Sequence, residues 1–596
     1  MKEFLKLVIV LFFLVSSAYL SGQNMVSPKR YDCHYRKGNI RIDGQLDDRA
    51  WQNVSWSDNF VDIASAKTAS PNRMTRMKMI WDSTHLYIAA CLVETDLTGR
   101  LRHHDDTIYH DNDFEVFIDP DGDGKNYFEI EINTLGTVMD LFLPKPYNAG
   151  GRADMQWDVK GLQTAVARYG TLNHPGDTDS RWTVEIAIPW KALKGQRPPA
   201  EGDVWRMNFS RVEWLMDTSN GKYVKRKNLA TGELLPEENW VWSPQGVVNM
   251  HIPSRWGYVR FDHNPAPVTI PKIWVWSQAH RSWNDNHWFN VLRKLSQAGI
   301  TGLLLSADTA QLHKIVLMAQ CFNMQVQAWY VTMNNRKAPA QWLSVNALGQ
   351  SLARQKAYVD YYKFMCPALP AVRQFLQEKM KELGSVRGLS GIHFDYIRYV
   401  DVILPKKLQP KYHLKQTDIM PQFDYGYHPY MRKIFKEKYG TDPLHLPDPL
   451  HDTTWLHFRL KVLDTTVIQL RNEIRNMGLA VSAAVFPTPD MSRRMVRQDW
   501  SRWHLDEYFP MAYHNFYGKK YAWLKRVSTT DRQAVGEHAK IFTGLFLPAL
   551  KKRHQLTRAM KASLKGGADG IALFDLRVLD DHLLRQVAAF RRNQGW

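Results

Sequence analysis

Residues 272–596 constrain the fold most, because short apolar runs alternate there with amphipathic helical stretches. The clearest helical stretch begins after Asp452, a good N-cap, and stops at Gly478. Eight strands are predicted, at 272–278, 301–306, 325–331, 391–396, 480–486, 508–513, 541–547 and 570–574. Eight strands alternating with helices predict a closed (β/α)8 barrel, known as a TIM barrel. The alternative is an open doubly wound sheet, which normally carries a Gly-rich phosphate loop after its first strand, and this sequence has none there.

The region before the barrel has a different pattern, with short β-type segments separated by turns. These segments are rich in β-branched or aromatic residues and lie at 77–81, 86–92, 114–118, 127–132, 182–188 and 205–212. The pattern predicts a β-sandwich over residues 30–262. Residues 263–271 contain three prolines and are predicted to form a stiff linker. The sequence therefore predicts a multidomain protein, with a β-sandwich followed by a barrel.

The first residues have the pattern of a secretory signal peptide. Lys2 and Lys6 give a basic start, residues 7–15 are almost entirely apolar, and small and polar residues follow. We expect residues 1–22 to be removed and the mature protein to be periplasmic or secreted. The apolar run is too short for a comfortable membrane span, and no other stretch is long and apolar enough to cross a bilayer. No integral membrane segment is therefore expected after cleavage.

Cysteine content and charge argue against several classes of protein. The cysteines show no CxxC spacing, so neither a zinc site nor a disulfide framework is indicated. Two of them, Cys321 and Cys366, lie in apolar barrel segments and are predicted to be buried thiols. The formal net charge is +19, but Lys and Arg are spread along the chain without a long basic tract. We interpret this charge as diffuse and solubilising, with an acidic substrate as the alternative, and expect no nucleic-acid partner.

The segment 391–399 holds the most informative candidate for catalysis. Strand side chains alternate, so His393 and Asp395 share one face of the predicted fourth strand. The carboxyl ends of barrel strands form the active-site face, which places Asp395 at the mouth, with Arg398 just beyond it. A carboxyl group there can act as a nucleophile or a general acid/base in sugar chemistry. The alternative is a structural Asp395 that pairs with Arg398.

Hydrolysis of a glycosidic bond usually needs a second carboxyl group, which the sequence does not single out. Asp575 closes the eighth predicted strand, Asp490 follows the fifth, and Asp401 comes just after the fourth. Asp575 is favoured over Asp490 because it lies nearest a strand end. The alternative for each is a loop-capping carboxylate.

Side chains near other strand ends are candidates for substrate binding. Tyr513 and His514 end the sixth predicted strand and are expected to hydrogen-bond substrate or tune a carboxylate. Trp329 and Trp276 end or line the third and first strands, where they are sugar platforms or packed core residues. His393 and Arg398 are expected to position the sugar or to set the pKa of the catalytic carboxyl group.

Motifs along the barrel resemble glycosyl-hydrolase-like family 10, a group of proteins assigned as bacterial glycosidases with a TIM barrel. The resemblance covers nearly all of 272–596 and rests on 391–399 (GIHFDYIRY), Ala328-Trp329, Pro367, 505–513 (LDEYFPMAY) and 567–574 (GADGIALF). It implies a glycan-cleaving barrel in which Asp395 is the best position to carry over. The family often continues the fourth-strand motif with Pro, whereas this chain has Val400, so the loop that follows and the substrate can differ.

Segments of the front region resemble the family 9 carbohydrate-binding modules in the same order along the chain. They are 39–51 (NIRIDGQLDDRAW), 77–81 (MKMIW), 86–88 (LYI), 113–119 (DFEVFID), 182–189 (WTVEIAIP) and 256–259 (WGYV). The resemblance implies a sugar-binding module over 30–262. Exposed aromatic residues grip sugars in such modules, and the candidates are Trp157, Trp240 and Trp242, with packing inside the sandwich as the alternative.

A turn in the front region is a candidate Ca²⁺ site. Asp119, Asp121 and Asp123 alternate there, and such spacing can ligate Ca²⁺ through oxygen atoms. The position that would hold a bidentate Glu in an EF-hand is Ile130, and strands rather than helices flank the turn. A structural Ca²⁺ site and a plain polar turn therefore both remain open, and no cofactor is expected to be required for catalysis.

These observations together predict an exported glycoside hydrolase with an appended sugar-binding module. The 22 Trp and 25 Tyr residues favour a glycan partner, because aromatic faces stack on sugars, although large cores also use aromatic residues. One alternative is a non-catalytic glycan-binding protein that has kept the barrel. Another is a hydrolase of peptidoglycan strands, since the resemblance does not fix the polymer.

Overall fold

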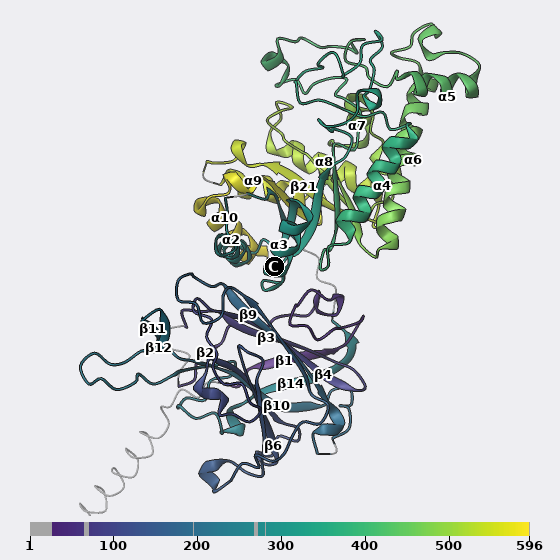
Figure 1. Cartoon of the computed structure of the whole chain (residues 1–596). Coiled ribbons are helices and arrows are strands. Elements are labelled where there is room, and N and C mark those ends of the chain that lie inside the picture. Colours follow the sequence, from purple (N-terminus) through teal and green to yellow (C-terminus); the bar gives the residue numbers. More distant parts are fainter. Residues whose placement is uncertain are drawn as a thin grey trace, which may run out of the picture. The chain divides into compact units, whose positions relative to one another are not determined.

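The structure is a computed structural model that describes residues 27–64, 71–194, 196–266, 272–280, 282–552 and 554–594. The chain divides into two compact units, one ending at residue 267 and the other beginning at residue 268 (Figure 1). The predicted signal peptide, 1–22, and residues 267–271 of the predicted linker lie outside the described residues. Among the described residues, no helix combines the length and apolarity needed to span a membrane.

Strands dominate the first unit. Twelve of them form one hydrogen-bonded sheet, with the order β7-β6-β5-β10-β14-β1-β3-β4-β9-β8, in which β13 also pairs with β10 and β2 pairs with β13. Their bounds are β1 (Arg30–Tyr35), β2 (Val61–Asp62), β3 (Thr75–Trp81), β4 (His85–Val93), β5 (Asp113–Asp119), β6 (Tyr127–Asn133), β7 (Val138–Leu143), β8 (Gln163–Tyr169), β9 (Arg181–Pro189), β10 (Val204–Glu213), β13 (Glu238–Val241) and β14 (Gly257–Pro265). A separate hairpin pairs β11 (Met216–Ser219) with β12 (Lys222–Lys225).

The large sheet folds back on itself around one core. Ile130 of β6 and Ile186 of β9 belong to the same buried cluster, although their strands lie near opposite ends of the strand order. Met207 and Phe209 of the central strand β10 join this cluster from alternate positions, as the period of a strand requires. The predicted β-rich front domain is therefore confirmed, with one continuous sheet supplying the layers that a sandwich would build from two.

The second unit contains the predicted eight-stranded barrel. All neighbouring strands are parallel and the sheet closes on itself, which confirms the barrel and excludes the open doubly wound alternative. The strands are β15 (Ile273–Gln278), β16 (Gly302–Ser306), β17 (Gln325–Val331), β18 (Gly391–Asp395), β19 (Ala480–Val485), β20 (Glu507–Pro510), β21 (Lys540–Phe546) and β22 (Gly570–Phe574). The sixth strand ends three residues before its predicted end, at Pro510, which has no N–H to continue a ladder.

A helix follows each barrel strand along the chain. The helices are α2 (Asp285–Ala298), α3 (Thr309–Gln320), α4 (Pro370–Gly384), α6 (Thr453–Asn476), α7 (Pro489–Val496), α8 (Tyr521–Val535), α9 (Gln555–Leu564) and α10 (Asp581–Gln594). The predicted cap of α6 is confirmed, because the Asp452 side chain accepts a hydrogen bond from the backbone N–H of Trp455 at 2.7 Å. The predicted buried thiols Cys321 and Cys366 are also confirmed.

A long segment between β18 and α6 adds one further helix, α5 (Pro429–Tyr439), outside the strand–helix repeat. Figure 1 shows α5 and the loops around it gathered at one end of the barrel. Asp424 anchors this segment, because its Oδ1 accepts from Arg459 of α6 at 2.8 Å and from Arg497 at 3.4 Å. Both charges of the Asp424–Arg459 pair are fully buried. Residues 401–450 therefore form an ordered insertion beside the carboxyl end of β18.

Candidate active site

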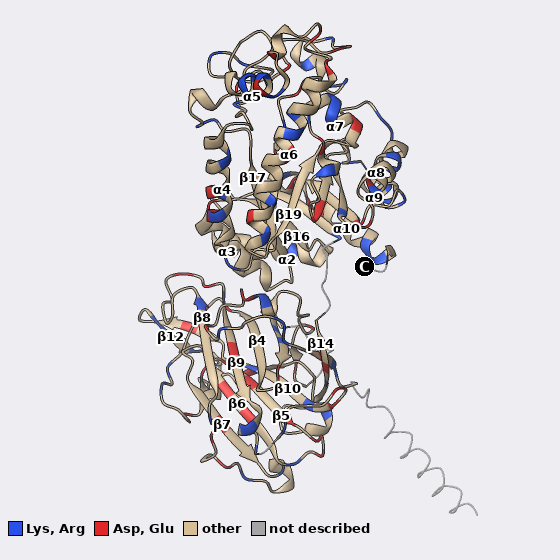
Figure 2. Ribbon diagram, turned by 90° about the vertical axis from the view of Figure 1, so that its right-hand side faces the viewer, with Lys and Arg blue, Asp and Glu red and all other residues tan. Residues whose placement is uncertain are grey.

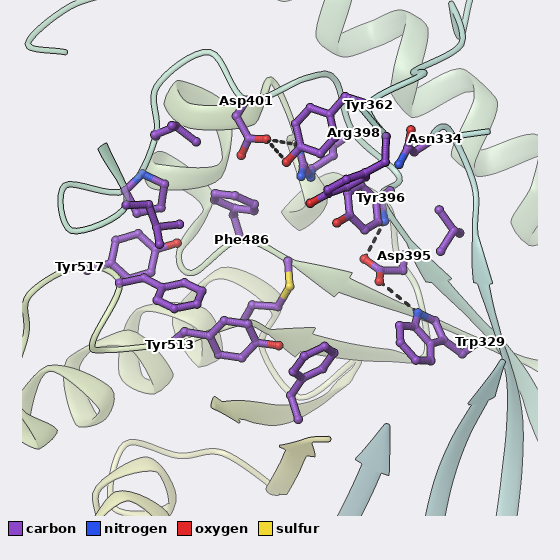
Figure 3. Close-up of a pocket in the computed structure, with 18 of the residues that line it drawn as sticks. Trp329, Asn334, Tyr362, Asp395, Tyr396, Arg398, Asp401, Phe486, Tyr513 and Tyr517 are labelled. Atoms are coloured by element: carbon purple, nitrogen blue, oxygen red, sulfur yellow. Dashed lines mark hydrogen bonds and ion pairs between the residues drawn. The ribbon is translucent and has the colours of Figure 1, made fainter. Parts of the chain in front are cut away.

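A cavity of about 460 Å³ lies at the carboxyl ends of the barrel strands, where TIM barrels carry their active sites. Its lining is mainly aromatic and apolar, with a few charged groups (Figure 3). The lining residues are Gln278, Trp329, Val331, Asn334, Tyr361, Tyr362, Asp395, Tyr396, Arg398, Asp401, Leu404, Pro405, Leu408, Tyr412, Phe486, Met511, Tyr513, Phe516, Tyr517, Phe574 and Arg577. The predicted residues Asp395, Arg398, Trp329 and Tyr513 thus come together around one hollow.

Asp395 ends β18 and is only 8 % exposed. Its Oδ2 accepts a hydrogen bond from Trp329 Nε1 at 3.0 Å, and its Oδ1 accepts from the backbone N–H of Tyr396 at 2.7 Å. Burial raises the pKa of the Asp395 carboxyl group, while these two hydrogen bonds and the charge of Arg398 act in the opposite direction. The carboxyl group therefore holds its proton to a higher pH than an ordinary Asp does.

The backbone turns sharply directly after Asp395. Tyr396 has a φ of 52°, in the left-handed region, which costs a residue with a Cβ atom about 1–2 kcal/mol. This turn brings the Tyr396 N–H back to the carboxyl group of Asp395, and the Tyr396 ring lines the cavity. Unfavourable backbone conformations of this kind are typical of functional sites.

Asp401 supplies a second acidic side chain to the cavity and is tied to the same wall. Its Oδ2 accepts from Arg398 at 3.2 Å and from the Tyr362 hydroxyl at 2.7 Å, as Figure 3 shows. Burial opposes the charge on Arg398, but the negative charge of Asp401 raises the pKa of the guanidinium group above its usual range. The structure does not favour the alternative in which Asp395 pairs with Arg398, since the ion pair of Arg398 is with Asp401, three residues further along the chain.

Trp329 lines the cavity from β17, and Tyr513 lines it from the loop that follows β20. Tyr513 is buried against the rings of Phe574 and Phe546, at centroid distances of 5.9 and 5.4 Å. Burial, together with the charge of Asp395, raises the pKa of the Tyr513 hydroxyl well above its usual range. The hydroxyl is therefore a neutral hydrogen-bond donor beside Asp395.

His393 and Trp276 do not line the cavity, which favours the packed-core alternative for Trp276 and does not place His393 where it would contact a substrate. Both are buried in the barrel interior, where Trp276 Nε1 donates to His393 Nε2 at 3.1 Å. His393 shares the inward face with Asp395 but lies two residues earlier, one layer deeper in the barrel. Burial lowers the pKa of its imidazole to about 3, so the ring is neutral.

His393 is one member of a directed chain of hydrogen bonds through the barrel core. Because Nε2 accepts from Trp276, the proton of the neutral ring is on Nδ1, which donates to Ser482 Oγ at 2.7 Å. Ser482 in turn donates to Gln327 Oε1 at 2.5 Å, and Gln327 Nε2 donates to Glu507 Oε2 at 2.7 Å. These hydrogen bonds satisfy polar groups that would be costly to bury alone. They also hold in place the layer of side chains directly beneath the cavity.

Asp575, Asp490 and His514 lie outside the set of cavity-lining residues, although all three follow barrel strands. The buried carboxylate of Asp575 caps the turn after β22 and pairs with Arg577 at 2.6 Å. Asp490 lies in the first turn of α7, which begins at Pro489, and its side chain is 89 % exposed. It forms an ion pair with Arg493 of the same helix. His514 is buried beside Tyr521, and its ring is neutral because burial lowers its pKa.

Several lining residues come from loops that the analysis of strand ends did not cover. Tyr361 and Tyr362 belong to the 38-residue segment 332–369 between β17 and α4, and Tyr412 belongs to the insertion, which also holds the predicted candidate Asp401. Such long segments are uncommon in compact domains and are often functional, so their length is the signal that could have found these residues.

The acidic turn of the front domain has the geometry of a closed loop. One oxygen atom each of Asp119, Asp121 and Asp123 lies within 4.8 Å of the others. The two carboxylate oxygens of Asp119 accept from the backbone N–H groups of Gly122 and Gly124, both at 3.0 Å. These bonds stabilise the turn without a metal, and Ca²⁺ binding there stays a prediction.

The tryptophans predicted to grip sugar in the front domain are not exposed platforms. Trp240 and Trp242 are buried in the main core cluster, and Trp157 packs against that cluster with its ring 4.9 Å from that of Phe128. The packing alternative is therefore the one the structure favours for Trp240 and Trp242.

Comparison with known proteins identifies the front domain. The family model described as "Carbohydrate family 9 binding domain-like" matches residues 42–224. The resemblance of this region to the family 9 carbohydrate-binding modules is thereby confirmed. A search of curated protein sequences finds no match.

Solved structures with similar folds are found for both units. A family 9 carbohydrate-binding module from Caldicellulosiruptor kristjanssonii, in complex with cellotriose, is 19% identical, with a TM-score of 0.27, 41% of this chain covered and 98% of that chain. The glycoside hydrolase domain of PgaB (BpsB) from Bordetella bronchiseptica is 13% identical, with a TM-score of 0.42 and coverages of 54% and 98%. The catalytic domain of β-amylase from Paenibacillus polymyxa is 11% identical, with a TM-score of 0.38 and coverages of 52% and 94%. No residue role is transferred from these remote structures, and membership of glycosyl-hydrolase-like family 10 stays a prediction.

Proposed function

We propose that the barrel is a glycoside hydrolase that cleaves an O-glycosidic bond of an oligosaccharide or polysaccharide. The observation that carries this proposal is the cavity at the carboxyl ends of the strands, lined by the two acidic residues Asp395 and Asp401. A pair of carboxyl groups flanking the scissile bond is the usual requirement of this chemistry. Asp401 thereby replaces Asp575 and Asp490 as the preferred second carboxyl group.

Asp395 is suited to be the general acid. Burial raises the pKa of its carboxyl group, so the proton is retained to a higher pH than in an ordinary Asp, as an acid that protonates the leaving oxygen needs. In the proposed step the Asp395 proton passes to the glycosidic oxygen as the bond from that oxygen to the anomeric carbon breaks. In one route water forms the new bond to the anomeric carbon while Asp401 accepts the proton of that water. In the other, Asp401 bonds to the anomeric carbon, and water then breaks this ester while the ionised Asp395 accepts the proton of the water. Tyr513 is placed to donate a hydrogen bond nearby.

The lining of the cavity supports a sugar as the substrate. Aromatic rings stack on the apolar C–H faces of sugars, and Trp329, Tyr361, Tyr412 and Phe516 all contribute to the wall. Polar groups that can orient hydroxyls, such as Asn334 and Gln278, lie among them. This mixture of aromatic wall and few polar groups is common in small-molecule sites.

One observation favours a second candidate function, non-catalytic glycan binding. Asp401 already accepts hydrogen bonds from Arg398 and Tyr362, so its carboxylate is engaged before any substrate arrives. If Asp401 is only structural, Asp395 is the single acidic group of the cavity available for chemistry, and the barrel binds a glycan without cleaving it.

Two further proposals concern the rest of the chain. The family match over residues 42–224 supports glycan binding by the front domain, which would hold the barrel near a polymer. The pattern of residues 1–22 supports export to the periplasm or beyond. N-terminal sequencing of the protein recovered from its native cells, with its position in cell fractions, tests the second proposal.

The central experiment measures the release of reducing ends from a panel of purified polysaccharides and peptidoglycan by the full chain. The Asp395→Asn variant is expected to lose turnover on the responsive glycan by at least about 10²-fold while keeping its circular dichroism spectrum. Asp581→Asn, an exposed position on α10, is the matched control. Full activity of Asp395→Asn would refute the mechanism, and binding without turnover by the parent protein would favour the glycan-binding candidate.

A further inference from the structure

The front domain contains a separate cluster of acidic side chains on the paired strands β5 and β6. Glu115 of β5 lies directly opposite Glu131 of β6 in the antiparallel register. Asp113 lies two residues before Glu115 and therefore on the same face of β5. One carboxylate oxygen of each of these three residues lies within 4.8 Å of the others. Figure 2 shows the acidic residues of β6 in red.

All three carboxyl groups are removed from solvent. The exposed fractions are 0% for Asp113, 4% for Glu115 and 2% for Glu131. Like charges at opposed positions destabilise a sheet, and an unpaired charge is costly to bury. Burial raises the pKa of Glu115 to about 7, and burial together with the charge of Glu115 raises the pKa of Asp113 and of Glu131 well above the usual range.

Several oxygen atoms of this cluster have no hydrogen-bond partner. Oδ2 of Asp113 and Oε2 of Glu115 are buried and accept no hydrogen bond. Glu129, which lies outside the triad and is 5% exposed, adds a further unpartnered oxygen, Oε2. Glu115, Glu129 and Glu131 line one cavity of about 540 Å³, and Asp113 lies next to this lining, with an oxygen within 4.8 Å of those of Glu115 and Glu131.

The charged Asp, Glu, Lys and Arg side chains that line this cavity in the described residues are all acidic. Within the part of the chain that the structure describes, neither Lys nor Arg lines the cavity. His251 lines it, with Nε2 at 4.0 Å from Glu129 Oε2 and Nδ1 at 3.0 Å from the Tyr127 hydroxyl. Burial lowers the pKa of His251 to about 4, so the ring is neutral at physiological pH and supplies no charge.

We propose that Asp113, Glu115 and Glu131 bind a divalent metal cation of the hard, oxygen-preferring class, with Ca²⁺ as the best match. The donors are all carboxylate oxygens, which this class prefers, whereas softer metals favour nitrogen and sulfur. Ca²⁺ takes about 6–8 oxygen ligands at roughly 2.3–2.6 Å in flexible geometry, so three carboxylates leave positions for water from the cavity. A cation at this point converts the repulsion between the opposed acids into attraction.

The backbone already holds two of the three carboxylates in place. Glu131 Oε2 accepts from the Tyr109 N–H at 3.0 Å, and Asp113 Oδ1 accepts from the Val212 N–H at 3.1 Å. The site differs in this respect from the turn at 119–123, where Asp121 and Asp123 are exposed and the carboxylates cap the turn itself. A test must therefore separate the two acidic clusters.

Isothermal titration of the chelator-treated full chain with CaCl₂, MgCl₂ or MnCl₂ tests the proposal. The double variant Glu115→Gln/Glu131→Gln removes two of the three charges, and Asp121→Asn/Asp123→Asn removes two from the turn. Glu233→Gln, in an exposed loop of the same domain, is the control for a single lost charge. We expect the parent to bind Ca²⁺ and the Glu115/Glu131 variant to bind it at least about tenfold more weakly, because even the loss of a second-shell group costs that much.

The variant of the turn is expected to keep this binding event, even if a second event is lost. The Glu115→Gln/Glu131→Gln variant should fold, because Gln keeps the shape of the side chain and removes the repulsion between the acids. Circular dichroism checks the fold. If the double variant does not fold, the single variant Glu115→Gln is compared with the parent instead. The proposal is overturned if the parent binds none of the three ions, if the Glu115/Glu131 variant binds as the parent does, or if only the turn variant loses binding.

Discussion

Trp329 donates its indole N–H to Oδ2 of Asp395 across neighbouring barrel strands, at an N–O distance of 3.0 Å. In the parallel register of β17 and β18, Asp395 lies beside Val331, two residues after Trp329. A hydrogen bond to an ionised carboxylate favours the ionised form, whereas burial of Asp395 favours the protonated form. Trp329 therefore limits how far burial raises the pKa of Asp395, in addition to forming part of the cavity wall.

Replacing Trp329 by Phe is expected to raise the pKa of Asp395 further, because the indole donor is lost and the ring is kept. A hydrogen bond to a charged group is worth about 1.5–3 kcal/mol, which corresponds to roughly one to two pH units. The limb of the pH–rate profile that reports loss of the Asp395 proton should move to higher pH by that amount. A profile of kcat/KM that stays in place, at reduced height, would mean that Trp329 acts only as a sugar platform.

The ion pair of Arg398 and Asp401 leads to a prediction about stability. Both side chains are buried, so Asp401→Asn leaves a buried guanidinium group without its charge partner. We expect the free energy of unfolding of the barrel to fall by about 3–5 kcal/mol, measured by chemical denaturation. The double variant Arg398→Met/Asp401→Leu removes both charges and should recover most of that loss. Equal losses in the single and double variants would show that packing, rather than the ion pair, sets the cost.

Because the His393 imidazole is buried and neutral, the free energy of unfolding is predicted to fall as the pH falls. Its pKa is about 3 in the folded chain, against an ordinary value of 6.5, so the unfolded chain binds this proton first as the pH falls. The stability contributed by His393 is therefore present above pH 6.5 and is lost between pH 6.5 and 3, at about 1.4 kcal/mol per pH unit.

Carboxyl groups with raised pKa values have the opposite effect, because they favour the folded state as the pH falls. Comparison with a variant of His393 separates its contribution from theirs. His393→Asn is expected to be less stable than the parent at pH 7, because Trp276 and Ser482 lose well-placed partners. The difference between the two proteins should narrow by about 2 kcal/mol when the pH falls from 7 to 5. If the difference in unfolding free energy between the two proteins stays constant with pH, the His393 ring binds its proton equally in the folded and unfolded states, which contradicts the prediction.

The sequence predicted the position of Asp395 well because two simple rules determine it. Strand alternation determines that the Asp395 side chain points into the barrel, and its position at the carboxyl end of the strand places it at the end where the active site lies. The first rule alone also selected His393, which lies on the same face but one layer deeper, where Trp276 and Ser482 enclose it. Alternation predicts which face of the strand a side chain lies on, but not how far along the strand the cavity begins. That position depends on the length of the neighbouring strands.

The second carboxyl group could not be selected in this way, because its direction depends on loops. Asp401, Asp490 and Asp575 all follow barrel strands, but only Asp401 lines the cavity. Its direction is set by Arg398, three residues earlier, and by Tyr362, which is 39 residues earlier in the chain and belongs to another loop. Contacts of this kind arise from tertiary packing and have no local pattern in the sequence.

Asp575 provides the sharpest contrast with Asp401. It pairs with Arg577, which lines the cavity and is 58% exposed at its side chain, so this ion pair is worth no more than about 1 kcal/mol. Asp575→Asn releases Arg577 and is therefore expected to change KM by up to about fivefold, with kcat within about twofold of the parent. Michaelis kinetics on the glycan found by the polysaccharide screen measure both quantities, and Arg577→Ala should shift KM in a similar way. If Asp575 were the second catalytic carboxyl group, kcat would instead fall by about 10²–10⁴-fold, and Asp401 would lose its proposed role.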